Sequence, residues 1–312
     1  MLTDFEKQMQ KRDDTKKAAQ AKVQPPIIGA EERGAPSPGR RRLLGQLALG
    51  TLALSASGAA YGNQVDDLEV IQCEVFLPGW PESKDGYKIG QVTDMHCDNA
   101  AALARVKRAV AQIIALQPDV AVITGDYASE GCSSFLGAGV DALRPLAGLP
   151  GGAFAIMGNH DFEKPHRPSR AADFVVAAGI HLLRNKSAAI PGVPNAYFVG
   201  LDDILEGRPN LKAATSDVPA SAIRILLVHE PDYADQVGPG FSLQISGHSH
   251  GGQVRIPGLP PLHEPSLGRR YPQGLQVGPY NPVYTSKGVG VTAIPLRLYC
   301  RPDVTLITLR SA

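Results

Sequence analysis

Two histidines lie two residues apart in the glycine-rich stretch ISGHSHGGQV, residues 245–254. In an extended backbone, side chains at this spacing point to the same face, so His248 and His250 can reach neighbouring metal ions. Four more polar clusters, DMH, GD, GNHD and HEP, follow apolar runs earlier in the chain. Each cluster alone is a weak signal, because short motifs match by chance. Their joint occurrence indicates a metal site.

The candidate ligands carry carboxylate, amide and imidazole groups. They are Asp94, His96, Asp126, Asn159, His229, His248 and His250. Two divalent cations about 3.5 to 4 Å apart need roughly four to six ligands each, with one ligand shared, and Asp126 is the natural bridge. The mixed nitrogen and oxygen set favours Mn²⁺, Fe²⁺ or Zn²⁺ over calcium. Two carboxylates against four positive charges would leave a cationic site, which suits a phosphate.

Apolar runs that precede the polar clusters predict an α/β domain. We expect strands at 68–77, 87–93, 119–124, 153–157, 181–183, 196–201, 223–228, 242–246, 289–293 and 304–309, and helices at 100–116, 134–146 and 169–178. In a sheet with helical crossovers, the carboxyl ends of the strands face one crevice, where ligands collect. Clusters that are remote in the sequence are therefore expected to converge there.

Composition limits the function further. The formal net charge of the 312 residues is only +1, so no global field attracts nucleic acid, and we expect no sequence-specific nucleic-acid binding. Any affinity for phosphate must come from a local site. The four cysteines lie far apart without a CxxC pair, which argues against a zinc finger and against a dense disulfide scaffold. Free thiols and a single disulfide both remain open.

The N-terminal part differs from the rest of the chain. Residues 1–39 are hydrophilic and are predicted to be disordered. Residues 40–60, RRRLLGQLALGTLALSASGAA, resemble a bacterial twin-arginine export signal, with small residues at 57–60 as a cleavage site. A retained membrane anchor remains open, because residues 43–60 are near the lower limit of about 17 residues for a span, as does a basic tail beside a buried helix. Residues 61–84 are expected to form a linker and the first strand, and 85–312 the catalytic domain.

The ordered motifs VTDMH, TGDY, MGNHD, LLVHEP and SGHSHGGQ, within residues 92–253, resemble those of the calcineurin-like metallophosphoesterases. The ending VYTSKGVGVTAIPLRLYCRPDVTLITL and the N-terminal signal resemble the exported bacterial branch of that family. The resemblance implies a four-layer αββα sandwich, in which two mixed β-sheets are flanked by helices. It also implies a division of the ligands. Asp94, His96, Asp126 and His250 would surround one metal, and Asp126, Asn159, His229 and His248 the other.

His160 and Asp161 complete the GNHD motif. The resemblance implies that His160 protonates the leaving-group oxygen or stabilises the transition state, and that Asp161 orients it. A positioned acid of this kind contributes about two to four orders of magnitude in rate. Many members of the family carry an acidic or basic residue three positions after the bridging aspartate, where this chain has Ser129. Substrate contacts near that position are therefore open.

The sequence thus predicts a dinuclear phosphoesterase that hydrolyses phosphomonoesters or phosphodiesters by attack of a metal-bridging hydroxide. If the chain is exported, it meets the twin-arginine machinery as a partner and acts outside the cytoplasmic membrane, in the periplasm or on an anchor. Its substrates would be lipid headgroups, nucleotide-linked sugars or wall polymers. The alternative is a non-catalytic metal-binding or protein-interaction module on the same fold, which predicts eroded ligands. A serine hydrolase is disfavoured because no GxSxG elbow occurs.

Overall fold

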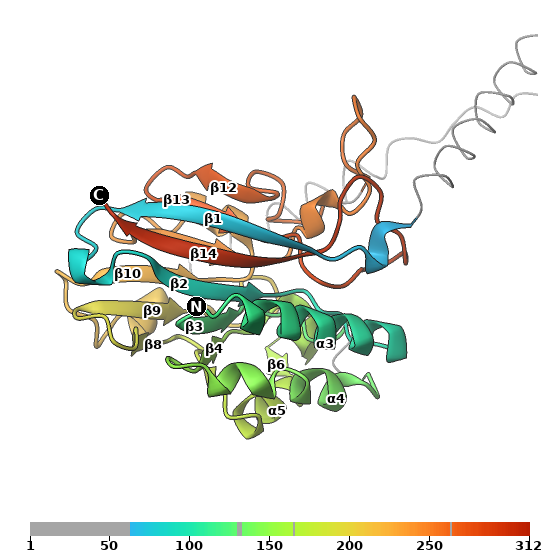
Figure 1. The fold of residues 1–312 in the computed structure, drawn as a ribbon, viewed down its shortest axis with the longest axis horizontal. Coiled ribbons are helices and arrows are strands. Elements are labelled where there is room, and N and C mark those ends of the chain that lie inside the picture. The colour runs from blue at the N-terminus through green and yellow to red at the C-terminus, as the bar shows by residue number, and fades with distance from the viewer. Residues whose placement is uncertain (1–62, 130–132, 165, 263) are drawn as a thin grey trace, which may run out of the picture. The chain divides into compact units, whose positions relative to one another are not determined.

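The computed structural model describes residues 63–129, 133–164, 166–262 and 264–312. The segments predicted to be disordered (1–39) and to direct export (40–60) lie outside the described residues. Two six-stranded sheets form the centre of the described part, and helices cover the outer face of the first (Figure 1). Within the described part, no helix has both the length and the apolar character that crossing a membrane requires.

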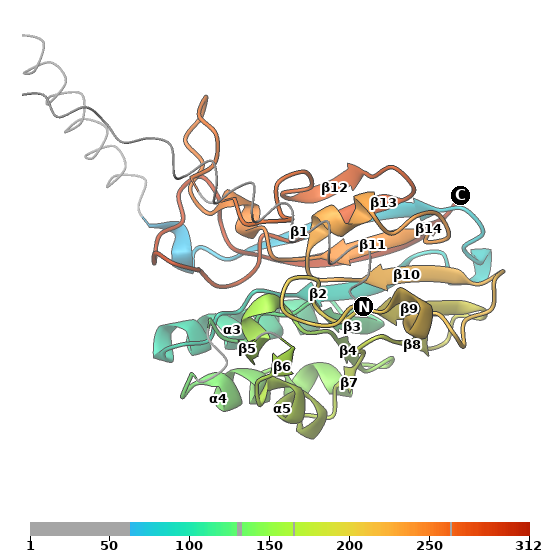
Figure 2. The same cartoon turned by 180° about the vertical axis from the view of Figure 1, so that it is seen from behind.

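The first sheet has the order β1-β14-β2-β3-β4-β7. Its strands are β1 (Glu69–Leu77), β14 (Asp303–Ser311), β2 (Tyr87–Val92), β3 (Val120–Ile123), β4 (Ala153–Ala155) and β7 (His181–Leu182). All neighbours are parallel except β14 and β2. The helices α3 (Ala100–Ala115), α4 (Leu136–Asp141) and α5 (Ala171–Ala177) cover its outer face, as Figures 1 and 2 show.

The second sheet has the order β12-β13-β11-β10-β9-β8. Its strands are β12 (Gly274–Val277), β13 (Pro282–Thr285), β11 (Leu243–Ser246), β10 (Ile223–Leu227), β9 (Ala196–Gly200) and β8 (Lys186–Ala189). The central pairs are parallel and both outer pairs are antiparallel. Among the described residues, its outer face carries the short α6 (Leu211–Ala214), the 3₁₀-helix η5 (Pro231–Asp235) and loops. The predicted class, two mixed sheets flanked by helices, is confirmed. A small ribbon of β5 (Phe162–Lys164) and β6 (Arg167–Pro168) completes the strands.

Alternating side chains build the hydrophobic layers. In β3, Val120 and Val122 pack between the two sheets, whereas Ala121 and Ile123 pack against the helices. In β10, alternate residues likewise face the first sheet and the outer layer, as the period of two along a strand requires. Both faces of each central strand are therefore buried. This explains why their sequences are continuous apolar runs that end abruptly in polar clusters.

The helix predicted at 100–116 is confirmed, and the helix predicted at 134–146 is not continuous. The side chain of Asn99 accepts a hydrogen bond from Ala102 N (2.9 Å) and caps α3. The second segment forms α4 and then the 3₁₀-helix η3 (Arg144–Gly148), because two glycines lower its helix propensity and Pro145 lacks a donor. Gly139 also lets the buried Cys97 pack closely against α4, since a Cβ on residue 139 would lie 2.8 Å from Cys97 Sγ.

The predicted strand at 289–293 is wrong. This segment is a loop that runs beside the residues after β2, where Val289 N donates to Thr93 O (3.1 Å) and Gly290 N donates to Asp94 O (2.7 Å). A Cβ on Gly290 would lie 2.3 Å from Met95 O, so the two backbones touch. The apolar pattern here reflects that close approach rather than a sheet. The sequence also does not predict β8, β12 and β13, which are short and lie in or near the edges of the second sheet.

Candidate metal centre

The candidate ligands follow the carboxyl ends of strands from both sheets. β2, β3 and β4 in the first sheet precede the motifs DMH, GD and GNHD, and β10 and β11 in the second precede HEP and GHSH. The side chain of Gln91 joins the sheets next to this point, because its Nε2 donates to Ser246 O (2.8 Å). The aspartates and histidines of the set form two groups, in each of which the ligand atoms lie within 4.8 Å of one another.

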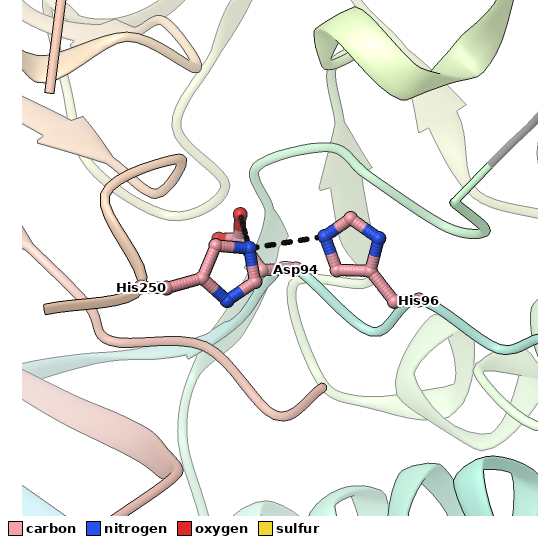
Figure 3. Close-up of side chains that lie close together, drawn as sticks. All are labelled: Asp94, His96 and His250. Carbon is pink, nitrogen blue, oxygen red and sulfur yellow. Dashed lines mark hydrogen bonds and ion pairs between the residues drawn. The ribbon is translucent and has the colours of Figure 1, made fainter. Parts of the chain in front are cut away.

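The first group consists of Asp94, His96 and His250 (Figure 3). His250 Nε2 lies 3.5 Å from Asp94 Oδ1 and 3.0 Å from His96 Nε2. All three residues are buried. Burial raises the pKa of Asp94 to about 6 and lowers that of His96 to about 4. His96 is therefore neutral at pH 7, and its imidazole can donate a lone pair to a cation.

The second group consists of Asp126, His229 and His248. His229 Nδ1 lies 2.6 Å from Thr124 O, and because a carbonyl only accepts, this nitrogen carries the proton. His229 Nε2 is buried and lies 3.1 Å from Asp126 Oδ2. Although burial lowers the pKa of His229, the Asp126 carboxylate outweighs it and raises the pKa well above its usual value. The same carboxylate that attracts a proton here would attract a divalent cation.

His248 and Asn159 present two facing acceptor atoms at the centre. His248 Nε2 lies 2.8 Å from Ser266 O and must donate to it, and burial lowers the pKa of His248 to about 3. His248 Nδ1 is therefore an acceptor, and it faces Asn159 Oδ1 at 3.0 Å. Two acceptors at this distance repel each other unless a cation lies against both. These residues therefore fit a divalent metal through Nδ1 and Oδ1.

Asp126 is a member of the second group and also lies close to the first. Its Oδ2 lies 3.1 Å from His229 Nε2 and 3.5 Å from His96 Nε2. Burial disfavours its charge, but the surrounding histidines, His229 above all, hold the pKa of Asp126 well below its usual range. The carboxylate is thus ionised at neutral pH and lies where a shared ligand is required. The structure brings all seven predicted ligands together.

The ligand loops adopt a rare backbone conformation. Five of the seven predicted ligands have positive φ angles: Asp94, His96, Asp126, His248 and His250, at 41° to 68°. Such residues cost of order 1–3 kcal/mol each and persist where surrounding contacts determine them. Two glycines allow the loops to approach. A Cβ on Gly247 would lie 2.2 Å from Asp94 Oδ2, and one on Gly158 would lie 2.4 Å from Asp126 Oδ1.

His160 lies beside the centre without joining either group. Its backbone N donates to Asp126 Oδ1 (3.0 Å), and its ring lies 5.1 Å from the ring of His96, measured between centroids. His160 Nδ1 donates to Ser129 O, so Nε2 is the nitrogen that can exchange a proton with a substrate. This arrangement suits a proton donor held next to the ligands.

The expectation that Asp161 orients His160 is corrected. The buried carboxylate of Asp161 accepts from the backbone N atoms of Asp126, Gly158 and Tyr127 at 2.8, 2.8 and 2.9 Å. Asp161 therefore fixes the backbone that carries the bridging ligand. The Ser129 carbonyl orients the His160 ring, because the turn after β3 passes directly beside it.

Two further residues support the ligands without being identified from the sequence. Ser129 Oγ lies 3.0 Å from His96 Nδ1, so Ser129 contacts both His96 and His160. Arg297 is fully buried, lies 3.3 Å from His250 Nδ1 and donates to the carbonyls of Lys287 and Gly290 at 2.7 Å each. It ties the loop of His250 to the loop that packs against Asp94. The residue types do not predict these supporting roles, because the contacts join segments that are remote in sequence.

The geometry and donor set define a metal-dependent phosphoester hydrolase. A family model described as calcineurin-like phosphoesterase matches residues 87–252, more than half of the chain, and the chain belongs to this family. It is 33% identical over 288 residues to the phosphodiesterase YaeI of Escherichia coli, covering 86% of this chain and 98% of that protein. It is 29% identical over 274 residues to the uncharacterized metallophosphoesterase YkuE of Bacillus subtilis, covering 86% and 95%.

A solved structure of a dimetal phosphatase from Danio rerio overlaps 68% of this chain and 90% of its own, with 13% identity and a TM-score of 0.41. The assignment to the family rests on the sequence relatives. The family implies divalent metal ions, and the two ligand groups match that implication.

Asp126→Asn should abolish binding of the metal pair. An amide places one neutral oxygen where a charged, shared carboxylate oxygen is needed, so we expect the metal content measured by mass spectrometry to fall from about two per chain to one or fewer. Asp173→Asn, on the exposed side of α5, is the matched control and should keep the parent's metal content. Equal metal content in the two variants would contradict the bridging role.

Arg297→Gln should weaken metal binding although Arg297 is no ligand. Loss of a group that holds a metal-binding histidine typically costs about 10- to 100-fold in affinity. We expect a shift of this size in a Mn²⁺ titration followed by calorimetry. Arg301→Gln removes a nearby arginine that pairs with Asp67 at the surface, and it should leave the affinity unchanged. Unchanged Mn²⁺ affinity in Arg297→Gln, with folding verified by circular dichroism, would show that the arginine has no part in the site.

Proposed function

We propose that the chain uses two metal ions, Mn²⁺, Fe²⁺ or Zn²⁺, to hydrolyse phosphomonoesters or phosphodiesters outside the cytoplasmic membrane. The proposal rests on the position of Asp126 Oδ2, which lies within 3.5 Å of a histidine from each ligand group. The name of the Escherichia coli relative, a phosphodiesterase, favours diesters. The alternative of a non-catalytic module has no support, because all seven ligands are present and lie together.

Two divalent cations at this centre would supply Lewis acidity for the phosphoryl oxygens and a nucleophile derived from water. The protein's own groups do the rest. Asp94 and Asp126 place two negative charges among four imidazoles, so the loaded site carries positive charge that binds an anionic ester. The Ser129 carbonyl holds His160 Nδ1, which leaves Nε2 to pass a proton to the departing oxygen. Rigid loops fix these groups before substrate arrives, so that the contribution is positional and electrostatic.

Replacement of His160 by Ala should separate turnover from metal binding. We expect kcat for p-nitrophenyl phosphate or bis-p-nitrophenyl phosphate to fall by about two to four orders of magnitude, with metal content unchanged, because His160 is a proton donor and no ligand. His181→Ala, an exposed histidine on β7, should keep the parent's kcat. Full activity in His160→Ala would contradict the role. Inertness of the parent toward both esters with Mn²⁺, Fe²⁺ and Zn²⁺ would contradict the function.

Export is supported by the twin-arginine pattern at residues 40–60. Replacement of Arg40, Arg41 and Arg42 by Lys keeps the charge but removes the recognised pair. In a bacterium that has the twin-arginine machinery, cell fractionation should find the parent outside the cytoplasm and the variant inside it. Arg33→Lys is the control and should be exported. Export of the triple variant would show that this segment is no twin-arginine signal.

A further inference from the structure

Two loops next to the metal centre expose aliphatic side chains. The loop 255–262 carries Ile256, Leu259 and Leu262, which are 39%, 62% and 70% exposed, and the loop 291–299 carries Ile294, which is 42% exposed. We call these four residues the apolar surface. Figures 1 and 2 show both loops at the end of the described part toward which β10 and β11 point. The ligands His229 and His248 follow the carboxyl ends of these two strands, so they lie toward the same end.

Hydrogen bonds make the two loops one unit. Val254 and Leu298 form a β-bridge, and Arg255 N donates to Leu298 O (2.9 Å). The buried side chain of Gln253 donates to the carbonyls of Thr292 and Ile294 at 2.9 and 3.0 Å. The loops also contain four prolines, Pro257, Pro260, Pro261 and Pro295, which restrict the backbone. The hydrogen bonds and prolines therefore keep the aliphatic side chains exposed to solvent. An exposed apolar surface of this kind suits an apolar partner.

The place where the chain enters the described part bears on which apolar partner this surface binds. Asn63, the first described residue, donates through Nδ2 to Pro295 O (2.7 Å) and accepts from Arg297 N (3.1 Å). The apolar stretch 43–60 ends three residues earlier, and three residues span at most about 10 Å. Residue 60 can therefore lie no more than about 10 Å from Asn63, which is bonded to the loop that carries Ile294.

The charges of the two loops favour a lipid bilayer as the partner. Residues 255–262 and 291–299 contain no aspartate or glutamate, and they contain two arginines, of which Arg297 is buried. A surface that meets anionic lipid headgroups must lack carboxylates, since these would be repelled and desolvated. The most exposed aliphatic residue of the described part, Val277, does not share this setting. Val277, 92% exposed, pairs with Pro282 at the start of β13, and β13 runs parallel to β11, so Val277 lies at the opposite end of the sheet.

We propose that the apolar surface rests on a lipid bilayer, with Ile256, Leu259, Leu262 and Ile294 at the boundary between headgroups and acyl chains. Interfacial elements of this kind reach about 5–10 Å into the membrane. The centre then opens close to the headgroups. If the proposed phosphoesterase function holds, its substrate is a phosphoester carried by a membrane lipid.

Tryptophan fluorescence tests the lipid contact. The chain has a single tryptophan, Trp80, which is 3% exposed and gives a constant background. In the full chain, Leu259→Trp should shift its emission to the blue on phosphatidylethanolamine–phosphatidylglycerol vesicles and lose roughly half of the added emission when the acyl chains are brominated, given the expected depth. Val277→Trp, the matched control, should show neither change, even if residues 43–60 tether both variants equally.

Three results would overturn the lipid contact. Equal quenching of the two variants would show that the apolar surface does not face the bilayer. A blue shift of Leu259→Trp without lipid that grows with protein concentration would assign the surface to a second copy of the chain. A lipid-free blue shift independent of concentration would assign it to another segment of the same chain, such as residues 43–60.

The substrate consequence has its own test. In the metal-loaded full chain, Leu259→Ser combined with Leu262→Ser should lower hydrolysis of a vesicle-borne phospholipid diester about tenfold and leave hydrolysis of soluble bis-p-nitrophenyl phosphate unchanged, because neither leucine touches the centre. Equal rates on vesicles for the parent and the variant would contradict the lipid substrate. Inactivity of the parent on every ester would instead contradict the proposed function, while the quenching result would stand on its own.

Discussion

The buried carboxylate of Asp161 joins the ends of two strands, and the metal centre depends on that link. Its oxygens accept the backbone N–H groups of Asp126 and Tyr127 after β3 and of Gly158 after β4. These three bonds fix one turn against the other, and Asp126 Oδ2 is thereby held between a histidine from each ligand group. Without the carboxylate, three buried donors would lose their acceptor, at about 1–3 kcal/mol each. The position of Asp126 is thus set by backbone hydrogen bonds to Asp161, which is not itself a ligand.

The same logic extends to the other loops. Each sheet delivers its parallel strands to a common edge, but strand ends alone would leave the ligands on separate loops. Gly158 and Gly247 let the turns touch carboxylates of neighbouring loops, and the left-handed backbone at five ligands turns their side chains inward. This conformation is unfavourable for residues other than glycine. Contacts such as those of Gln91, Thr93 and Arg297 therefore stabilise a geometry that the local sequence disfavours.

The two mixed sheets were implied by the resemblance to the family. Residue types and strand patterns were sufficient to predict an α/β domain, the long helix α3 and the convergence of the seven candidate ligands, because buried strands and polar strand ends leave clear periodic signals. They were insufficient where a contact joins distant segments. The residues at 289–293 are apolar and β-branched, yet their backbone packs on the loop after β2 and forms no strand. The residues around Arg297 contain no polar cluster that would indicate a role at the metal centre, and only the folded chain brings Arg297 to His250. Asp161 has the residue type expected of an orienting group, but the turn geometry directs it to the backbone instead.

The charges explain how the fold accommodates such a buried centre. Burial lowers the pKa of His96 to about 4 and of His248 to about 3, so both stay neutral and keep a lone pair across the neutral range. The proton that His229 attracts balances the ionised Asp126, and the Thr93 hydroxyl donates to Asp94. The folded chain therefore tolerates two buried carboxylates by surrounding them with donors and neutral imidazoles. A divalent cation bound here would displace a proton and lie against the facing acceptors at His248 and Asn159. The loops that would hold the cation are fixed by bonds from residues outside the ligand set, such as Asp161 and Arg297, so the geometry of the centre depends on the rest of the fold.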